Sequence, residues 1–158
     1  MTMILILLVI FQIKHLVADF MLQGKYMLGK FSRDWDFFLP LLAHAGVNAA
    51  FTLLICLCVS PSLWWLAIVD LVTHFLIDRM KAGQRYLGRF KLLSAMEMKD
   101  NIEVMNTEKV LGVNQHTDNI KRAIWHNTFF WWALGVDQMM HQLVYIFIVA
   151  VLSGAIPI

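Results

Sequence analysis

The stretch Ala67–Lys81, AIVDLVTHFLIDRMK, places polar residues at regular intervals inside an apolar run. Asp70, His74 and Asp78 follow one another at every fourth position, so an α-helix would stack them on one face. Ionisable side chains in a membrane-spanning helix are costly to bury and indicate a functional site by default. The alternative is a purely structural polar seam that joins this helix to a neighbour, because buried carboxylates need partners.

The composition predicts an all-α integral membrane protein. Of the 158 residues, 59% are hydrophobic and only 15% are charged, which is far from the balance of a soluble domain. We expect a single domain over residues 1–158, because no linker or repeat divides the chain. A net charge of +2 is too small to indicate a nucleic-acid partner.

Four apolar segments are long enough to cross a bilayer, and they predict a bundle of four transmembrane helices over residues 3–22, 37–59, 63–80 and 128–152. The first lacks the basic start of a signal peptide and is expected to be retained. The one long polar loop covers residues 81–127. Apolar residues recur there at near-helical spacing beside basic ones, which predicts an amphipathic helix on the membrane surface.

The distribution of lysine and arginine predicts the orientation. Nine of the 13 basic residues lie in the region 79–127, three lie in the link 24–36, and none lies in the turn Ser60–Ser62. Basic loops tend to stay in the cytoplasm. We therefore expect both basic loops to be cytoplasmic and both termini to lie on the opposite side, which an even number of spans allows.

The other spans repeat the spacing of the first stretch. His15, Asp19 and Gln23 are four residues apart in the first span, and His44 is followed four residues later by Asn48 in the second. The fourth span carries Asp137, Gln138 and His141. At about 1.5 Å per residue, these groups and those of the third span share a layer roughly 12 Å thick on the cytoplasmic side. This convergence predicts one polar site within the bundle.

Mixed histidine and aspartate groups on facing helices are typical of metal sites in helix bundles. We expect a divalent transition metal, Zn²⁺ foremost, with Mn²⁺ or Fe²⁺ as alternatives. The predicted ligands are His15, His44, Asp70, His74, Asp78 and His141. Asp19 and Asp137 are predicted to be catalytic, as general bases. Residues expected to orient the ligands are Gln23, Asn48, Lys81 and Gln138. Taken singly, pairs such as His15 and Asp19 are also explained by helix packing.

The sequence resembles the DUF3307 family of small, uncharacterised bacterial and phage membrane proteins. The resemblance rests on HLVADFMLQ (residues 15–23), the helix of His44, HFLIDRMK (residues 74–81) and DQMMH (residues 137–141). Members often show a second histidine four residues after the one that matches His44, where this chain has Asn48. The resemblance implies a location in the bacterial inner membrane. More distantly, the chain resembles membrane-bound metal-dependent hydrolases of the DUF457 type.

These features favour an intramembrane metal-dependent hydrolase that acts on a lipid or amphiphilic substrate from the cytoplasmic side. A metal with an open position can activate water, and a free carboxylate can move the proton. One alternative is a component of a cation or proton transporter or channel, for which a four-span chain would form a homo-oligomer. Another is a membrane binding or regulatory protein whose polar cluster is only structural. The expected partners are membrane lipid and a second copy of the chain.

Overall fold

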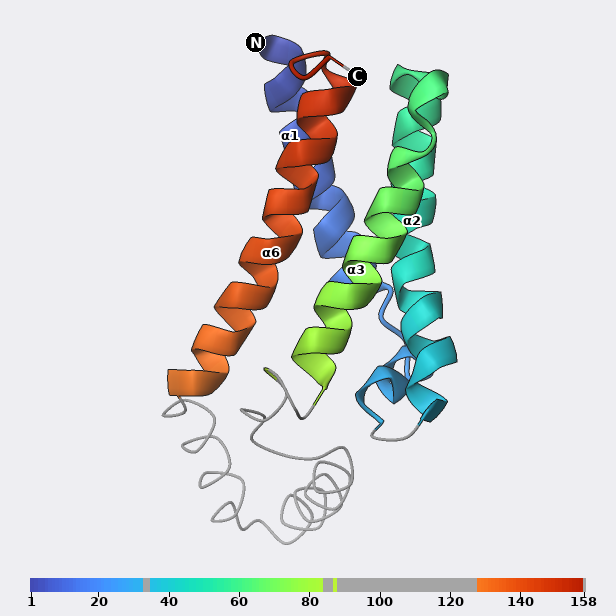
Figure 1. Cartoon of the computed structure of the whole chain (residues 1–158), viewed down its shortest axis with the longest axis vertical. Coiled ribbons are helices and arrows are strands. Elements are labelled where there is room, and N and C mark those ends of the chain that lie inside the picture. The colour runs from blue at the N-terminus through green and yellow to red at the C-terminus, as the bar shows by residue number, and fades with distance from the viewer. Residues whose placement is uncertain (33–34, 84–86, 88–127, 158) are drawn as a thin grey trace, which may run out of the picture.

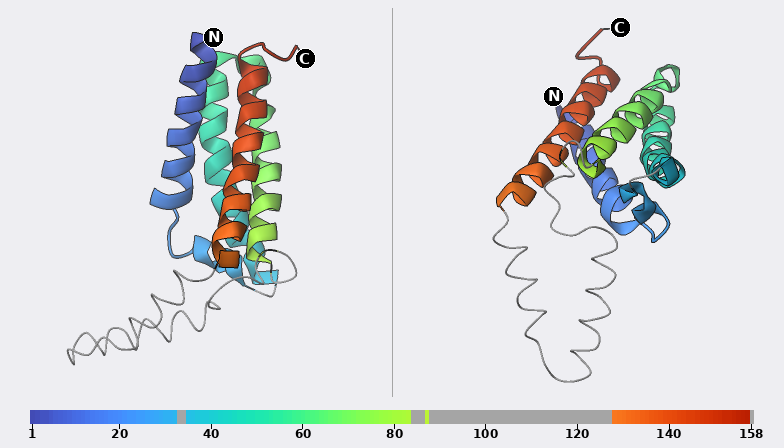
Figure 2. Two further views of the ribbon diagram at one scale, coloured as in Figure 1. Left: turned by 90° about the vertical axis from the view of Figure 1, so that its left-hand side faces the viewer. Right: turned by 60° about the horizontal axis from the view of Figure 1, so that its bottom comes forward.

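The computed structural model describes residues 1–32, 35–83, 87 and 128–157. Within this part, four long helices run side by side and form a bundle, as Figures 1 and 2 show from three directions. Four segments are long and apolar enough to span a membrane: Thr2–Met21, Trp35–Val59, Pro61–Ala82 and Thr128–Leu152. The chain is therefore an all-α membrane-protein bundle, as its composition predicts.

The first span changes its helical geometry before it ends. The α-helix α1 covers Thr2–Leu16, and a π-helical segment, η1, follows over Val17–Met21. In η1 the N–H of Leu22 donates to the carbonyl of Val17, five residues earlier, at 2.9 Å. Single π-helical turns inside α-helices are rare and frequently lie at functional sites. The sequence predicts the span but not this turn, which contains Asp19.

The second and third spans form an antiparallel helical hairpin. The 3₁₀ segment η3 (Trp35–Phe37) leads into α2 (Phe38–Val59), and η4 (Pro61–Leu63) leads into α3 (Leu66–Ala82). Pro40 lies in the first turn of α2, where its missing N–H costs little. The predicted bounds, 37–59 and 63–80, agree with these helices to within a few residues.

The fourth span, α6, covers Thr128–Leu152, the predicted bounds. Both termini and the turn between α2 and α3 lie at one end of the bundle in Figure 1. The link between the first two spans lies at the other end and contains the 3₁₀ segment η2 (Met27–Phe31). The predicted amphipathic helix of residues 81–127 falls almost wholly outside the described residues.

The interior of the bundle has two parts. Toward the end that holds the termini it is apolar, and Leu7, Phe11, Leu66 and Ile148 belong to this core. The rest of the interior contains the buried polar and charged side chains, together with apolar ones such as Leu41 and Ala45. Large apolar side chains cover much of the outside of the four helices, including Leu54, Ile68 and Phe147. A polar interior inside an apolar exterior is the arrangement expected of a protein whose outer surface faces lipid.

Candidate metal centre

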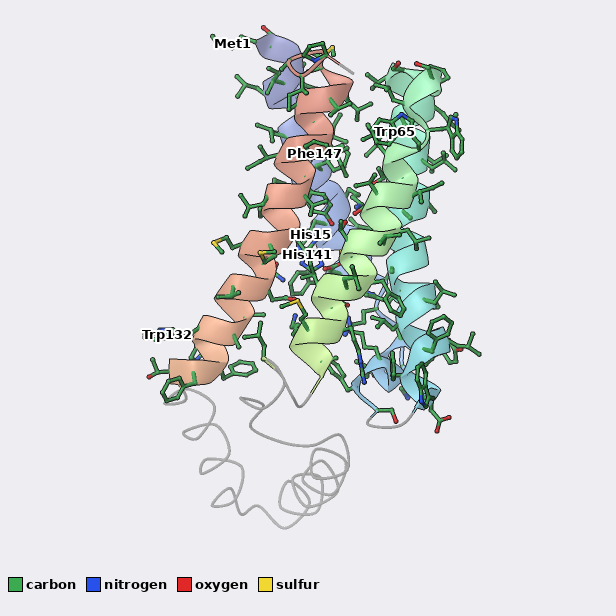
Figure 3. All side chains as sticks on the ribbon, viewed as in Figure 1. Met1, His15, Trp65, Trp132, His141 and Phe147 are labelled. Atoms are coloured by element: carbon green, nitrogen blue, oxygen red, sulfur yellow. The ribbon has the colours of Figure 1, made fainter. Side chains whose placement is uncertain are left out.

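All four spans contribute side chains to the polar part of the interior. In Figure 3 the labelled His15 and His141 lie about midway along the bundle, between the helices. The buried polar and charged residues of the described part are Lys14, His15, Lys30, His44, Asn48, Thr52, Asp70, His74, Asp78, Asp137 and His141.

Spacing along each helix explains why these side chains meet. On α2, His44, Asn48 and Thr52 are buried at successive fourth positions. A helix places residues four apart on nearly the same side. The same spacing holds for Asp70, His74 and Asp78 on α3 and for Asp137, His141 and Tyr145 on α6. Each helix thus presents one polar stripe to the centre of the bundle.

Asp19, His44 and His74 bring three ligand atoms together near the centre. The Nε2 atoms of His44 and His74 lie 3.3 Å apart. Oδ1 of Asp19 lies 3.7 Å from Nε2 of His44 and 3.5 Å from Nε2 of His74. Ligand atoms about 2.0–2.2 Å from a tetrahedral zinc lie roughly 3.3–3.6 Å from one another. The triangle therefore has nearly the dimensions of one face of a tetrahedral zinc site.

A second group of three, His74, Asp78 and His141, shares His74 with the first and is fully buried. Nδ1 of His141 lies 2.9 Å from the backbone carbonyl of Asp137. Because a carbonyl only accepts hydrogen bonds, this contact places the ring proton of neutral His141 on Nδ1. Nε2 then carries a free lone pair, 3.8 Å from Oδ1 of Asp78. A backbone carbonyl commonly fixes a metal-binding histidine in this tautomer.

Asn48 lies against the first group. Its Nδ2 is 2.7 Å from Oδ1 of Asp19 and 3.2 Å from Nε2 of His74, so the side chain touches two of the three ligand atoms. The oxygen and nitrogen of an amide are assigned from the hydrogen-bond network. With the amide rotated by half a turn, Oδ1 of Asn48 would face the same point as a further oxygen ligand.

Three of the four carboxylates in the cluster are each paired with a lysine. The pairs are Lys14–Asp70 at 2.6 Å, Lys30–Asp78 at 2.7 Å and Lys81–Asp137 at 2.6 Å. The first two pairs are buried on both sides, whereas 29% of the Lys81 side chain is exposed. Removing one partner of such a pair would leave an uncompensated buried charge, which is strongly destabilising.

Asp19 is the fourth carboxylate, and within the described part of the chain its only ion-pair partners are histidines. Within the part of the chain that the structure describes, four carboxylates of the cluster therefore face three ammonium groups, which leaves one negative charge when the histidines are neutral. The excess lies at the carboxylate that belongs to the first group of three. A cation held by Asp19, His44 and His74 would compensate this charge, so the electrostatics agree with the ligand spacing.

His15 lies beside the first group of three without belonging to either group. Its Nε2 lies 2.9 Å from Oε1 of Gln138, and its Nδ1 lies 3.2 Å from the hydroxyl of Tyr145 and 3.3 Å from Oδ2 of Asp19. Gln138 also donates to Asp137 at 3.0 Å. His15 thus contacts Asp19, one of the candidate ligands, as expected of a residue that positions the Asp19 side chain.

Several buried polar atoms of the cluster have no hydrogen-bond partner among the described residues. They are Nδ1 of His44, Nδ1 of His74, Nε2 of His141 and one carboxylate oxygen each of Asp70 and Asp137. Buried polar atoms are normally paired, and each exception needs an explanation such as an ion or a catalytic role. An additional polar group inside the bundle would satisfy some of these atoms, and a bound cation would satisfy the lone pair of His141.

The structure brings together most of the residues that the spacing selects. Asp19, His44, His74, Asp78 and His141 make up the two groups, although the sequence assigned Asp19 to catalysis. Asp70 and Asp137 lie outside both groups with their lysines, and Gln23 belongs to neither.

Sequence reasoning missed Lys30, Thr52 and Tyr145 as members of the cluster. Thr52 donates to Asp70 at 2.5 Å, and Tyr145 lies within reach of Lys14. Both continue a four-residue spacing, from Asn48 and from His141, that could have revealed them. Lys30 gave no such signal, because it belongs to the short link and was counted only as a loop charge.

Comparison with known proteins identifies a family. A family model described as "Protein of unknown function (DUF3307)" matches residues 6–157, nearly the whole chain. The chain therefore belongs to the DUF3307 family. No curated protein and no solved structure matches it.

Proposed function

We propose that this DUF3307 protein binds a divalent transition metal inside the membrane and uses it for hydrolysis. The observation that carries the proposal is the triangle of Asp19 Oδ1, His44 Nε2 and His74 Nε2, whose sides are 3.3–3.7 Å. Nitrogen and carboxylate ligands at this spacing suit Zn²⁺ best, with Mn²⁺ and Fe²⁺ as alternatives. Asp78, His141 and Asn48 offer further ligand atoms beside it.

The surrounding residues fit a hydrolytic site. A bound divalent metal of this kind supplies a nucleophile at neutral pH by activating water. Asp19 is better placed as a ligand than as the predicted base. Asp137 remains the candidate general base, because its Oδ1 is buried without a hydrogen-bond partner among the described residues and lies 4.0 Å from Nδ1 of His141. Its partner Lys81 is partly exposed and could exchange protons with water at that end of the bundle.

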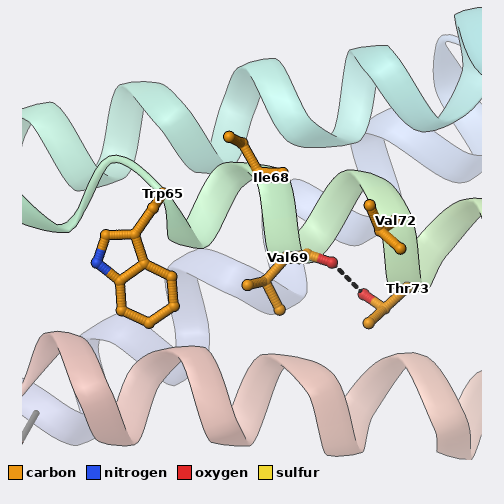
Figure 4. A pocket seen from close by; sticks show the side chains of 5 residues that line it. All are labelled: Trp65, Ile68, Val69, Val72 and Thr73. Carbon is orange, nitrogen blue, oxygen red and sulfur yellow. Dashed lines mark hydrogen bonds between the residues drawn. The ribbon is translucent and has the colours of Figure 1, made fainter.

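The outer surface of α3 supports an amphiphilic substrate. Trp65, Ile68, Val69, Val72 and Thr73 line an almost wholly apolar groove of about 410 Å³, shown in Figure 4. The hydroxyl of Thr73 donates to the carbonyl of Val69 at 2.7 Å. The groove adjoins Asp70 along the chain and would lie at the depth of the lipid tails. An acyl chain in this groove would bring a lipid close to the polar interior.

Metal content tests the first part of the proposal. Purified protein should contain about one zinc, manganese or iron ion per chain by elemental analysis. His74→Ala should remove it, because His74 belongs to both groups of three. Cys58→Ala is the control and should retain the metal, because this exposed thiol on α2 belongs to neither group. The wild-type protein could instead be metal-free, with a thermal stability that changes neither with chelators nor with added Zn²⁺. This result would favour a purely structural cluster.

Turnover tests the second part. Asp137→Asn should leave metal content intact and lower lipid hydrolysis by a factor of about 10² or more, as expected on removal of a general base. Wild type and variant would be compared in liposomes, with lipid products followed by mass spectrometry and ion flux followed in parallel. If the wild-type protein moves a cation down its gradient and changes no lipid covalently, the result would favour transport over hydrolysis as the function.

A further inference from the structure

One polar pair lies on the outside of the bundle rather than inside it. Nε2 of Gln12 on α1 donates a hydrogen bond to Oε1 of Gln142 on α6, and this contact is exposed. Among the described residues of the four α-helices, Gln12 is the one amide, acidic, basic or histidine side chain that is exposed. Every other such side chain of these helices is buried or half-buried. The proposed function does not use this pair.

The depth of the pair is unfavourable for an exposed amide. Gln12 lies close to the middle of the span Thr2–Met21, and Gln142 lies close to the middle of Thr128–Leu152. Both amides would therefore face the centre of the hydrocarbon layer, where no water can pair with them. An unsatisfied polar group there costs several kcal/mol, about as much as its transfer from water to an apolar solvent. Their mutual hydrogen bond uses one donor and one acceptor and leaves the remaining amide groups available.

Exposed apolar residues flank the pair on both helices. On α1, Leu5, Val9 and Leu16 are exposed and share the face of Gln12 at intervals of three or four residues. On α6, Met139 and Ile146 are exposed and flank Gln142 in the same way. An apolar stripe with a polar group at its centre is the pattern by which membrane helices associate, since the polar group hydrogen-bonds across the interface.

We propose that this face of α1 and α6 is the interface of a symmetric dimer, with Gln12 and Gln142 at its centre. A glutamine amide both donates and accepts, so the pair is complementary to a second copy of itself across a twofold axis. Such an isologous contact is the commonest form of protein self-association. In this dimer, the amide groups left over in one copy would form hydrogen bonds with those of the other copy, so no other partner is needed. The proposal is independent of the metal centre.

Cross-linking within lipid bilayers tests the arrangement. Met139→Cys places a thiol on the proposed interface, and oxidation should link two chains through it. The native Cys58 is also exposed and provides an internal control, because it lies on α2, which contributes no residue to the proposed interface. It should not form the cross-link. Cross-linking through Cys58 but not through position 139 would place the interface elsewhere and overturn the proposal.

Dissociation in bilayers tests the role of the amides. The Gln12→Leu/Gln142→Leu variant should weaken the dimer by about 10-fold or more in energy-transfer measurements at decreasing protein-to-lipid ratio. Leu54→Ala, at an exposed position on α2, is the matched control and should leave association unchanged. An unchanged circular-dichroism spectrum and an unchanged temperature of thermal unfolding would show that the double variant is folded. A wild-type chain that is monomeric at every ratio, or a double variant that dimerises as well as wild type, would overturn the proposal.

Discussion

At the scale of single residues, lysines determine what each carboxylate can do. Asp70, Asp78 and Asp137 have the same chemistry as Asp19, yet each contacts an ammonium group at 2.6–2.7 Å. Their charges are compensated within the chain. Asp19 instead contacts histidines and Asn48, so its charge is available to a cation. Among the described residues, the lysines thus distinguish three carboxylates that have an ammonium partner from Asp19, which has none.

The pair of Lys30 and Asp78 gives a test of this view. Lys30→Met should lower the free energy of unfolding by about 3–5 kcal/mol, because it leaves the buried carboxylate of Asp78 without its ammonium partner. The loss would be measured by denaturant titration in bilayer-like discs. Lys25→Met, at an exposed position in the same link, should change stability little.

A double variant separates lost charge compensation from lost packing. Lys30→Met/Asp78→Leu removes both charges and should recover much of the stability lost in Lys30→Met, since a buried ion pair can often be replaced by apolar residues. Equal effects of Lys30→Met and Lys25→Met would contradict the view that Lys30 compensates Asp78 inside the bundle.

At the scale of elements, two short non-α segments bring residues into the cluster. The π-helical η1 contains Asp19, and the 3₁₀ segment η2 contains Lys30. Segment η1 ends the first span, whereas η2 belongs to the link and lies outside every span. Segment η2 packs against α2 through Gly29, where an added Cβ would lie 2.8 Å from Cγ of Pro40. This close approach fixes η2 next to α2 and directs Lys30 toward Asp78.

Gly29→Ala should therefore push η2 away from α2 and loosen the Lys30–Asp78 pair. We expect a loss of about 1–3 kcal/mol in the free energy of unfolding, as is common for overpacked sites. Gly46→Ala is the matched control, because nothing lies within 4 Å of an added Cβ there. Within a helix that substitution should be neutral or stabilising by up to about 1 kcal/mol. Indistinguishable unfolding curves for the two variants would show that η2 does not depend on this contact.

At the scale of the whole molecule, the arrangement of the ends constrains the topology. Both termini and the turn between α2 and α3 lie at one end of the bundle, and the link 24–36 lies at the other. With the distribution of basic residues, this arrangement predicts that the termini face away from the cytoplasm. The polar cluster then lies nearer the cytoplasmic side, which is the side from which we expect a substrate to enter.

Reporter fusions test this orientation. A reporter inserted at Ser60–Ser62 should lie outside the cytoplasm, together with a reporter at the C-terminus, because neither region carries a lysine or arginine. A reporter inserted near Lys99 should lie in the cytoplasm. Activity of all three reporters on the same side would contradict the four-span topology, and reversal of all three would place the cluster on the other side of the membrane.

The four spans, and the layer in which their polar residues meet, could be predicted from the sequence alone. Hydropathy and the spacing of residues along a helix are local properties, so they place the bounds of α6 and the polar stripes of α2 and α3 correctly. All five residues of the two candidate ligand groups, from Asp19 to His141, were selected in this way.

Which of these residues lie close together depends on the tertiary structure. Whether Asp70 meets a lysine or a histidine depends on the rotation and separation of helices far apart in the chain. Lys30 reaches Asp78 across 48 positions from a segment with no helical signal of its own. The tautomer of His141 depends on a backbone carbonyl, and the position of Asp19 depends on a π-helical turn. Spacing along one helix carries no information about such contacts, because they are set by packing between elements.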